Sequence, residues 1–484
     1  MQSEPLWTSD EAATATSGSA TTDWACHGVS IDTRTLQKGD LFVALKAARD
    51  GHDFVAQALD NGAAAALVTY RPEGVAEDAP LLIVSDVLKA LEDLGKAARA
   101  RMAGQVVAVT GSVGKTSTKE MLRKVLGGQG RVHASVASYN NHWGVPLTLA
   151  RMPAATDLAV IEIGMNHPGE IAPLVAMAQP NVAIVTTVAP AHLAAFESIE
   201  GIAHEKAAIF SGLKPDGTAI FNGDLEVSVI LEKTAKKHAT HLLRFGQNQG
   251  CDLWLKDVAI KYTATVGTAE ISGVPVLFKI AVPGRHYAMN AMSVLATVDA
   301  LNLDLAIAIA DLGQWEPGAG RGLRQVIALD PADTRPTIEL IDDAYNANPA
   351  SMAASLEVLA GAEVKDNIGR ISRGRRIAYL ADMGELGETE VQIHQGLAAL
   401  PSLEQVDRVH CIGPLMAHLY EALPSEKRGR WSETVDGMVD GIAKDLDAGD
   451  VVMAKGSLSM GMARLVDAIK KLGHPSPNVT EGTD

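Results

Sequence analysis

The residues with the most distinctive chemistry lie in one segment, Thr110-Gly-Ser-Val-Gly-Lys-Thr116. Glycines followed by a lysine and a hydroxyl residue can form a loop whose backbone N–H groups cradle phosphates, while Lys115 reaches the terminal phosphates and the Thr116 hydroxyl ligates Mg²⁺. Val109 stands where the longer phosphate-loop pattern has its first glycine, so this is the shorter Gly-x-x-Gly-Lys-Ser/Thr form. The pattern predicts a nucleoside triphosphate site that comprises Gly111, Ser112, Val113, Gly114, Lys115, Thr116 and Ser117.

The flanking residues predict the strand and the helix that such a loop requires. Val106 to Val109 is a short apolar, β-branched run, which is typical of a buried parallel strand. After the loop, apolar residues recur at helical spacing until Gly127 and Gly128 end the helix; they are Met121, Leu122, Val125 and Leu126. A plain glycine turn with an exposed lysine is the alternative, and both flanking elements disfavour it.

Three further residues are candidates for the same edge of a sheet. Glu162 lies near the end of the apolar run Leu158–Gly164, where open α/β sheets place ligands and where Mg²⁺ beside phosphates needs an oxygen ligand. A paired structural glutamate is the alternative. His192 follows the predicted strand Val182–Val188, although a lone histidine is most often structural. From spacing alone, Lys206 is an ordinary surface lysine.

Composition limits the class of protein. A chain of 484 residues is too long for one core, and its length suggests about three domains. It contains no signal-peptide pattern and no apolar run long enough to span a membrane, and its three cysteines have no metal-binding spacing. We therefore expect a cytoplasmic protein without membrane insertion. The net charge of −16 and the scarcity of aromatic residues argue against a nucleic-acid partner.

Alternating strand and helix patterns predict an α/β protein with three domains. We expect a small N-terminal α/β domain over residues 23–103 and a central P-loop ATPase domain with a parallel sheet over 104–320. A C-terminal Rossmann-like domain should cover 321–473, and a disordered tail 474–484. Residues 9–22 are interpreted as a flexible lead-in, and 215–280 as short β-like pieces.

Taken together, these landmarks resemble the Mur ligases of bacterial cell-wall synthesis, from about Gly28 to Ile469. The motifs that carry the resemblance are Thr110–Thr116, Asn140-Asn-His-Trp-Gly-Val-Pro146, Glu162-Ile-Gly-Met-Asn166, Ala191-His-Leu193, Gly284-Arg-His286 with Asn290, Asp342-Asp-Ala-Tyr-Asn-Ala-Asn-Pro349 and Lys455-Gly-Ser457. Within the family, the Asp342–Pro349 stretch points to the ligases that add D-alanyl-D-alanine. The Asp-Asn-Pro-Arg motif that resembles the diamino-acid-adding ligases is absent from the sequence.

The resemblance implies an enzyme that uses ATP and Mg²⁺ in peptidoglycan precursor synthesis. It would join D-alanyl-D-alanine to the peptide carboxylate of UDP-N-acetylmuramoyl-tripeptide through an acyl phosphate, and it would act as a monomer. Phosphorylating a carboxylate needs positioning and charge neutralisation rather than a nucleophilic side chain, which fits the residues present. The N-terminal domain would hold the UDP end of the substrate, and the C-terminal domain would close over the site.

The same resemblance assigns roles to individual residues. Those implied in catalysis are Lys115, Lys206, His192 and Glu162, and those implied at the metals are Thr116, Glu162, His192 and Lys206 as a carbamate. Asn290, Arg321 and Asp343 would meet ATP across the domain junction. The implied substrate contacts are Thr33, Arg34, Asp50, Gly51, His52, Asn140, Asn141, Asn346, Asn348, Lys455 and Ser457. The sequence departs from the family at Lys206-Ala-Ala, where a Lys-Gly-Glu-like run is usual, and at Tyr287, where an asparagine is common.

Other functions remain open on the sequence. A sister ligase that adds another amino acid, or one that extends a folate glutamate tail, would use the same ATP site. A non-catalytic nucleotide-binding scaffold could share the fold, because fold does not fix function. A simple phosphotransferase is disfavoured, since nothing in the sequence resembles a kinase catalytic loop.

Overall fold

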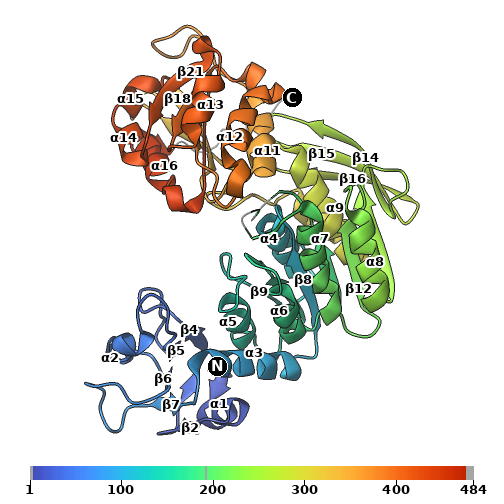
Figure 1. The fold of residues 1–484 in the computed structure, drawn as a ribbon, viewed down its shortest axis with the longest axis vertical. Coiled ribbons are helices and arrows are strands. Elements are labelled where there is room, and N and C mark those ends of the chain that lie inside the picture. Colours follow the sequence, from blue (N-terminus) through green and yellow to red (C-terminus); the bar gives the residue numbers. More distant parts are fainter. Residues whose placement is uncertain (1–3, 191–192, 194, 476–484) are drawn as a thin grey trace.

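The computed structural model of the chain describes residues 4–190, 193 and 195–475, which form three successive α/β domains (Figure 1). Each domain is built on its own sheet. The predicted fold class, α/β with three domains, is confirmed. Within the described residues, no helix is both long and apolar enough to cross a lipid bilayer.

The N-terminal domain, blue in Figure 1, contains a five-stranded sheet with the order β2-β7-β6-β5-β4. The strands β4 to β7 are parallel, and β2 pairs antiparallel with β7. The strands are β1 (Trp7–Thr8), β2 (Ser19–Ala20), β3 (Ala25–Cys26), β4 (Gly28–Ser30), β5 (Asp40–Val43), β6 (Ala65–Val68) and β7 (Leu81–Ile83), and the helices are α1 (Ser9–Thr16), α2 (Val55–Asp60) and α3 (Val87–Arg101).

The central domain contains a nine-stranded sheet with the order β16-β15-β14-β13-β12-β11-β8-β10-β9. Its strands are β8 (Gln105–Thr110), β9 (Val132–Ala134), β10 (Leu158–Glu162), β11 (Val182–Val185), β12 (Thr218–Asn222), β13 (His241–Gly246), β14 (Leu253–Ile260), β15 (Thr265–Ile271) and β16 (Val274–Ile280). The pairs from β9 to β14 are parallel, whereas β14, β15 and β16 form an antiparallel arm.

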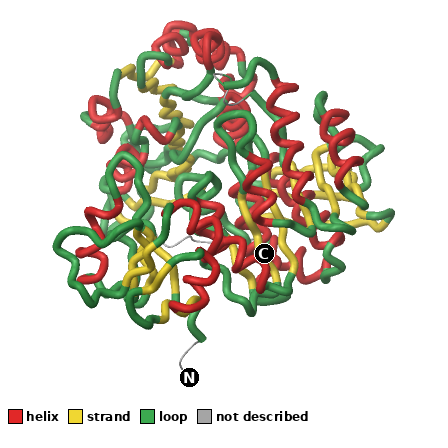
Figure 2. Tube along the Cα trace, turned by 60° about the horizontal axis from the view of Figure 1, so that its bottom comes forward, coloured by secondary structure: helices red, strands yellow, loops and turns green. Residues whose placement is uncertain are grey.

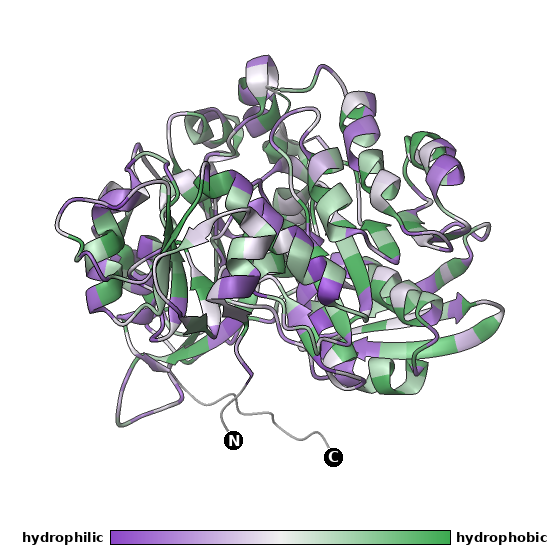
Figure 3. Ribbon diagram, turned by 90° about the horizontal axis from the view of Figure 1, so that it is seen from below, coloured by the Kyte–Doolittle hydropathy of each residue, from purple (hydrophilic) through white to green (hydrophobic). Residues whose placement is uncertain are grey.

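Helices cover both faces of this sheet, which is why its parallel strands are almost entirely apolar (Figures 2 and 3). The helices α4, α9 and α10 pack on one face, and α5 to α8 pack on the other. Their bounds are α4 (Lys115–Gly127), α5 (Gly144–Ala150), α6 (Ile171–Ala178), α7 (Ile199–Ala207), α8 (Ser228–His238), α9 (Arg285–Ala300) and α10 (Leu305–Leu312). The two faces therefore have separate cores.

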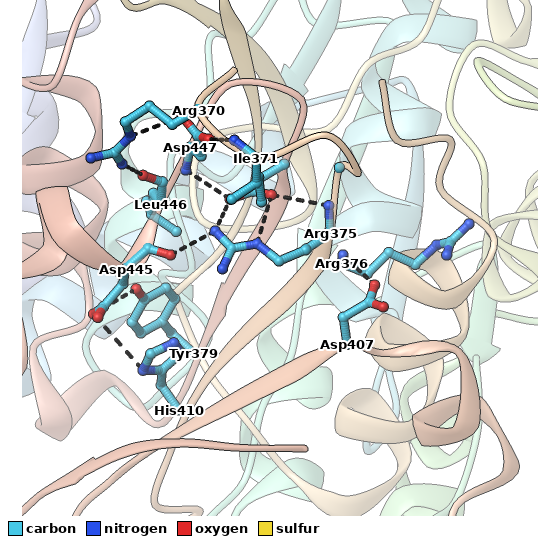
Figure 4. A network of polar contacts seen from close by, with 12 residues as sticks. Arg370, Ile371, Arg375, Arg376, Tyr379, Asp407, His410, Asp445, Leu446 and Asp447 are labelled. Atoms are coloured by element: carbon cyan, nitrogen blue, oxygen red, sulfur yellow. Dashed lines mark hydrogen bonds and ion pairs between the residues drawn. The ribbon is translucent and has the colours of Figure 1, made fainter. Parts of the chain in front are cut away.

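The C-terminal domain, orange to red in Figure 1, is a seven-stranded, doubly wound sheet with the order β21-β20-β19-β22-β18-β17-β23. Its elements are β17 (Leu323–Ala328), β18 (Thr337–Asp343), α11 (Pro349–Ala360), β19 (Arg376–Ala381), α12 (Glu390–Gly396), β20 (Arg408–Ile412), α13 (Met416–Ala422), β21 (Arg428–Ser432), α14 (Val435–Val439), α15 (Ile442–Asp445), β22 (Val451–Lys455), α16 (Ala463–Lys470) and β23 (His474–Pro475). The loop before β19 is fixed by ion pairs, since Arg370 contacts Asp447 (Figure 4) and Arg375 contacts Asp450.

The N-terminal and central domains share a hydrophobic core. Leu147 and Ala150 of α5 belong to the buried cluster that also contains Trp7 and the apolar face of α3. The Trp7 indole Nε1 donates to the Ala150 carbonyl at 2.8 Å, and Arg151 Nε donates to the Val29 carbonyl at 2.6 Å. The buried clusters of the C-terminal domain, by contrast, contain only residues of that domain.

Three predictions about local structure are wrong. The flexible lead-in at 9–22 is instead helix α1 and strand β2, because Thr8 and Glu11 form a capping box and Ala12 is buried. The β-like stretch 215–280 contains the helix α8, whose apolar residues are few. The start of the tail is ordered, since Pro475 pairs with Ile327; residues 476–484 lie outside the described part of the chain.

Candidate active site

The phosphate-loop sequence connects β8 to α4, as predicted. Gly114 has φ of 85°, a left-handed conformation that favours glycine, and it precedes the first residue of α4. A β-carbon at this position would lie 2.5 Å from Asn290 Oδ1, so the glycine also allows α9 to approach the loop. Because the first N–H groups of a helix have no partners within it, the start of α4 is suited to bind anions.

The residues after β11 hold the loop in place. Ser112 Oγ donates to the Ala189 carbonyl at 2.9 Å and accepts from the Ala189 N–H at 3.0 Å. Thr186 Oγ1 donates to the Val113 carbonyl at 2.6 Å. These bonds connect two neighbouring strand ends and pre-organise the backbone of the loop.

A buried carboxylate lies directly beside the loop. Glu162, at the end of β10, is fully buried and pairs in register with Val109 of β8. Thr116 Oγ1 lies 3.0 Å from both carboxylate oxygens, and Asn140 Nδ2 donates to Oε1 at 2.7 Å. Hydroxyl and carboxylate oxygens are the ligands that Mg²⁺ prefers, so this pair fits a magnesium ion next to bound phosphates.

Positive charge gathers around Glu162 although the chain as a whole is acidic. Burial lowers the pKa of Lys115, and the charge of Arg321 lowers it further. The Glu162 carboxylate opposes both effects. Lys206 is 1 % exposed, and burial together with the Lys115 charge holds its pKa well below the ordinary value for a lysine. The prediction of a surface lysine from spacing alone is wrong, because α7 packs this residue into the site. Lys115 and Arg321 place positive charge near the Glu162 carboxylate, which favours a polyanionic ligand.

The link between the central and C-terminal domains closes one side of the site. Arg321 Nη2 donates to Ser138 Oγ at 2.8 Å, and its guanidinium lies 4.1 Å from the centre of the Tyr345 ring. A cavity of about 440 Å³ opens next to the phosphate loop, with Thr116, Ser138, Trp315, Arg321 and Tyr345 among its lining residues. Its position beside the start of α4 makes it a candidate nucleotide pocket.

Comparisons with known proteins agree with this geometry. Three family descriptions match in succession: "Mur ligase family, catalytic domain" at residues 25–101, "Mur ligase middle domain" at 109–298 and "Mur ligase, glutamate ligase domain" at 331–458. The UDP-N-acetylmuramoyl-tripeptide--D-alanyl-D-alanine ligase of Bacillus subtilis is 35 % identical over 448 residues, 91 % of this chain and 92 % of that protein. The chain belongs to the Mur ligase family.

Further relatives give the same result for this Mur ligase. The Escherichia coli protein with the same printed name is 36 % identical over 393 residues, 81 % of this chain and 82 % of that protein. MurF from Acinetobacter baumannii superposes with a TM-score of 0.81 and 28 % identity, covering 97 % of this chain and 99 % of that one. MurF from Thermotoga maritima, solved with ADP, gives 0.74 and 27 %, with 92 % and 97 % covered.

The remaining nucleotide residues expected of a Mur ligase lie at the domain junction. Asp343, at the end of β18, accepts a hydrogen bond from Lys455 Nζ at 2.7 Å. His286 lies near this pair, and burial lowers its pKa to about 4 against the opposing Asp343 charge. Tyr287, where the family often has asparagine, donates its hydroxyl to the Arg321 carbonyl at 2.9 Å. This tyrosine therefore fixes the interdomain link.

Several expected substrate residues have structural contacts in the C-terminal domain. Asn348 caps α11 by accepting from the Ser351 N–H at 2.9 Å, and the Asn346 carbonyl accepts from Lys455 Nζ at 3.1 Å. Ser457 Oγ accepts from the Gly384 N–H at 2.8 Å. These bonds hold the loops after β18, β19 and β22 together on the side that faces the central domain.

The expected contacts of the UDP end lie in the N-terminal domain, away from the phosphate loop (Figure 1). Arg34 is exposed and paired with Asp32, and Thr33 lies beside it. His52 accepts from the Thr69 N–H at 3.0 Å, and its Nδ1 lies 2.7 Å from Asp50 Oδ1; Gly51 stands between them. Asn141, by contrast, lies in the central domain, where its side chain accepts from the Gly144 N–H at 2.9 Å.

His192 lies outside the described residues. Within 4–190, 193 and 195–475, no group of three histidine, cysteine, aspartate or glutamate side chains is placed to hold a metal ion. Thr116 and Glu162 are the oxygen-bearing pair that the described residues place beside the phosphate loop.

The sequence does not predict two residues that lie beside Glu162 and Thr116, namely Lys119, whose Nζ is 4.0 Å from Glu162 Oε2, and Ser138, whose Oγ is 3.4 Å from Thr116 Oγ1. Lys119 shares an apolar helix face with Leu122 and Leu126, three and seven residues later, and a charge at such a position is a detectable signal. Nothing in the sequence distinguishes Ser138.

Proposed function

We propose that this chain is an ATP-dependent ligase that joins D-alanyl-D-alanine to the peptide carboxylate of UDP-N-acetylmuramoyl-tripeptide. The observation that carries the proposal is the match to ligases of that name over about nine tenths of the chain. The site supports it, since Thr116 of the phosphate loop and the interdomain Arg321 line one cavity, and the buried Glu162 carboxylate contacts Thr116. We further propose that the enzyme acts as a monomer in the cytoplasm. Its three free cysteines fit a reducing compartment, and its net charge of −16 disfavours self-association.

The reaction requires two transfers that the residues can support by position and charge. The peptide carboxylate attacks the γ-phosphorus of ATP, giving an acyl phosphate and ADP. The D-alanyl-D-alanine amine then attacks the acyl carbon, forming the peptide bond and releasing phosphate and a proton. Lys115 and the start of α4 would hold the phosphates, and Arg321 would approach them from the domain junction. Asn290 and Asp343 would complete the nucleotide contacts.

Magnesium would be held by the Thr116 hydroxyl and the Glu162 carboxylate, with His192 as a further proposed ligand. When bound, the ion would neutralise phosphate charge and orient the transferred group. Asn140 keeps the carboxylate oriented by donating to it at 2.7 Å.

We also propose that Lys206 is carbamylated. A neutral amine attacks the carbon of CO₂ and loses a proton, and the lowered pKa of Lys206 makes the neutral amine available. The product is a carbamate, whose negative charge would offset the neighbouring Lys115. Two results together would support this. Bicarbonate should raise the activity of the wild type, whereas Lys206→Ala should lose activity that bicarbonate does not restore.

The remaining substrate contacts belong to the same proposal. Thr33, Arg34 and the Asp50–His52 turn would bind the UDP end, and Asn141 would lie near its diphosphate. The C-terminal residues Asn346, Asn348, Lys455 and Ser457 would contact the peptide end when the domains close.

The test is phosphate release from MgATP in the presence of UDP-N-acetylmuramoyl-tripeptide. We expect release that depends on both the tripeptide substrate and D-alanyl-D-alanine. Release with a single amino acid instead would assign a sister reaction of the family. ATP binding without release under any combination of acceptors would support a non-catalytic scaffold.

A further inference from the structure

Helix α4 carries a second lysine that the proposed reaction does not use. Lys119 lies one helical turn after Lys115 and is fully buried, unlike almost all lysines in proteins. Its ammonium lies 2.8 Å from Glu120 Oε1 and 4.0 Å from Glu162 Oε2. A buried charge is costly unless it is paired and hydrogen-bonded. The Lys119 ammonium therefore needs these carboxylates and further hydrogen-bond acceptors to remain buried.

The same ammonium fixes a loop of the backbone. Lys119 Nζ donates to the Ser135 carbonyl at 2.9 Å and to the Ala137 carbonyl at 2.6 Å. Ala137 has φ of 54°, in the left-handed region that residues with a β-carbon avoid. An alanine in this conformation needs an interaction that holds it there, and the Lys119 hydrogen bond is such an interaction.

The strained residue directly precedes Ser138, which connects two parts of the site. Ser138 Oγ accepts from Arg321 Nη2 at 2.8 Å and lies 3.4 Å from Thr116 Oγ1. A change of φ at Ala137 would redirect the backbone that carries this hydroxyl. Lys119 is therefore connected, through Ala137 and Ser138, both to Thr116 of the phosphate loop and to Arg321 of the interdomain link.

We propose that Lys119 is a positioning residue for nucleotide binding: it holds Ala137 in the left-handed conformation and thereby places Ser138 between Thr116 and Arg321. This inference rests on the proposed function, because it assumes that the cavity beside these residues receives ATP. Lys119 does not need to touch the nucleotide. Its effect is transmitted by the backbone of the Ser135–Ser138 segment.

A charge effect on Glu162 is the competing explanation, and it predicts a different result. Removing the ammonium would leave the negative charge of Glu162 less compensated, which would strengthen Mg²⁺ binding and would not depend on the residue at position 137. A positional effect should instead be relieved by glycine at 137, because glycine adopts positive φ without a steric cost.

The experiment measures binding of a non-hydrolysable ATP analogue with Mg²⁺ by titration calorimetry. We expect Lys119→Met to weaken binding about tenfold, since the buried Ser135 carbonyl and the partly buried Ala137 carbonyl lose their donor and the loop relaxes. Adding Ala137→Gly should recover about threefold or more of this loss. Ala137→Gly in the otherwise unchanged protein gives the affinity from which the effect of Lys119→Met in the glycine background is measured.

Ser272→Gly is the matched control, because Ser272 also has a left-handed φ, 50°, and lies in the exposed turn between β15 and β16. Combined with Lys119→Met, it should recover no affinity. Unchanged binding in Lys119→Met, or equal recovery by the two glycines, would overturn the proposal. If Lys119→Met does not fold, Ser138→Ala tests the same connection; it should weaken analogue binding about threefold or more, and unchanged affinity would overturn the inference. A wild-type protein that binds no analogue would instead contradict the proposed function.

Discussion

The C-terminal domain should lose stability as the pH falls from 7 to 5, because its sheet buries a histidine that resists protonation. His410 lies on β20 with 3 % of its surface exposed, and its ring stacks on Tyr379 with the centres 4.3 Å apart (Figure 4). Its Nδ1 accepts from the Arg430 N–H at 3.1 Å, which requires the neutral ring. Burial lowers the pKa of His410 from 6.5 to about 4, although Asp445 opposes the shift.

The direction and size of the effect follow from proton linkage. The folded state has the lower pKa, so the unfolded state binds more protons at pH 5, and the stabilisation present above pH 6.5 is lost as the pH falls toward 4. At pH 5 the loss from this group is about 2 kcal/mol. A variant without the imidazole should lack this part of the pH dependence.

Hydrogen exchange of the peptide that contains β20 measures the relevant free energy of unfolding. His410→Gln should cost stability at pH 7, and that cost should be smaller by about 2 kcal/mol at pH 5. His418→Gln, on α13 of the same domain, controls for loss of an imidazole elsewhere. An equal cost of His410→Gln at both pH values would refute the reasoning, because it would mean that the folded domain protonates His410 as readily as the unfolded chain does.

Three further perturbations separate the roles of the domains. Lys115→Ala should abolish phosphate release, while the affinity for the UDP-substrate, measured by calorimetry, stays within about twofold, because the UDP end is assigned to the N-terminal domain. Loss of both phosphate release and UDP-substrate affinity would contradict this division. Tyr262→Phe removes the hydroxyl that donates to Glu339 Oε2 at 2.7 Å between the central and C-terminal domains, and it should increase proteolytic cleavage near the interdomain link by about fivefold. Asn348→Ala removes the cap of α11 and should lower the free energy of unfolding of the C-terminal domain by about 1 kcal/mol, measured by urea titration; no change would show that the cap is replaced by solvent.

The sequence predicts the elements whose patterns are local and strong. The phosphate loop, its flanking strand and helix, and the strand that ends at Glu162 follow from apolar runs, glycines and one charge. The sequence does not predict helix α1, because its alanines and threonines are typical of flexible segments. Only the fold shows that Ala12 is buried in a hydrophobic core. The spacing predicts an exposed Lys206 for a similar reason: only tertiary packing shows that its helix face is covered.

Relations between distant segments are harder to predict. The contact between Arg321 and Ser138 joins residues far apart in the sequence, and no local pattern indicates it. The left-handed conformation of Ala137 cannot be predicted from the sequence either, whereas a glycine at this position would have indicated a turn. What decides these features is the packing of α4 against a loop and the path of the interdomain link.

The buried cluster shared by the first two domains determines how the chain can be divided. Because Leu147 and Ala150 of α5 complete a core that Trp7 and α3 begin, removing the N-terminal domain would expose apolar surface on the central domain. A fragment that starts at residue 104 should therefore aggregate, whereas one that ends near residue 320 should remain folded. The first two domains should therefore unfold together, and the third should be separable from them.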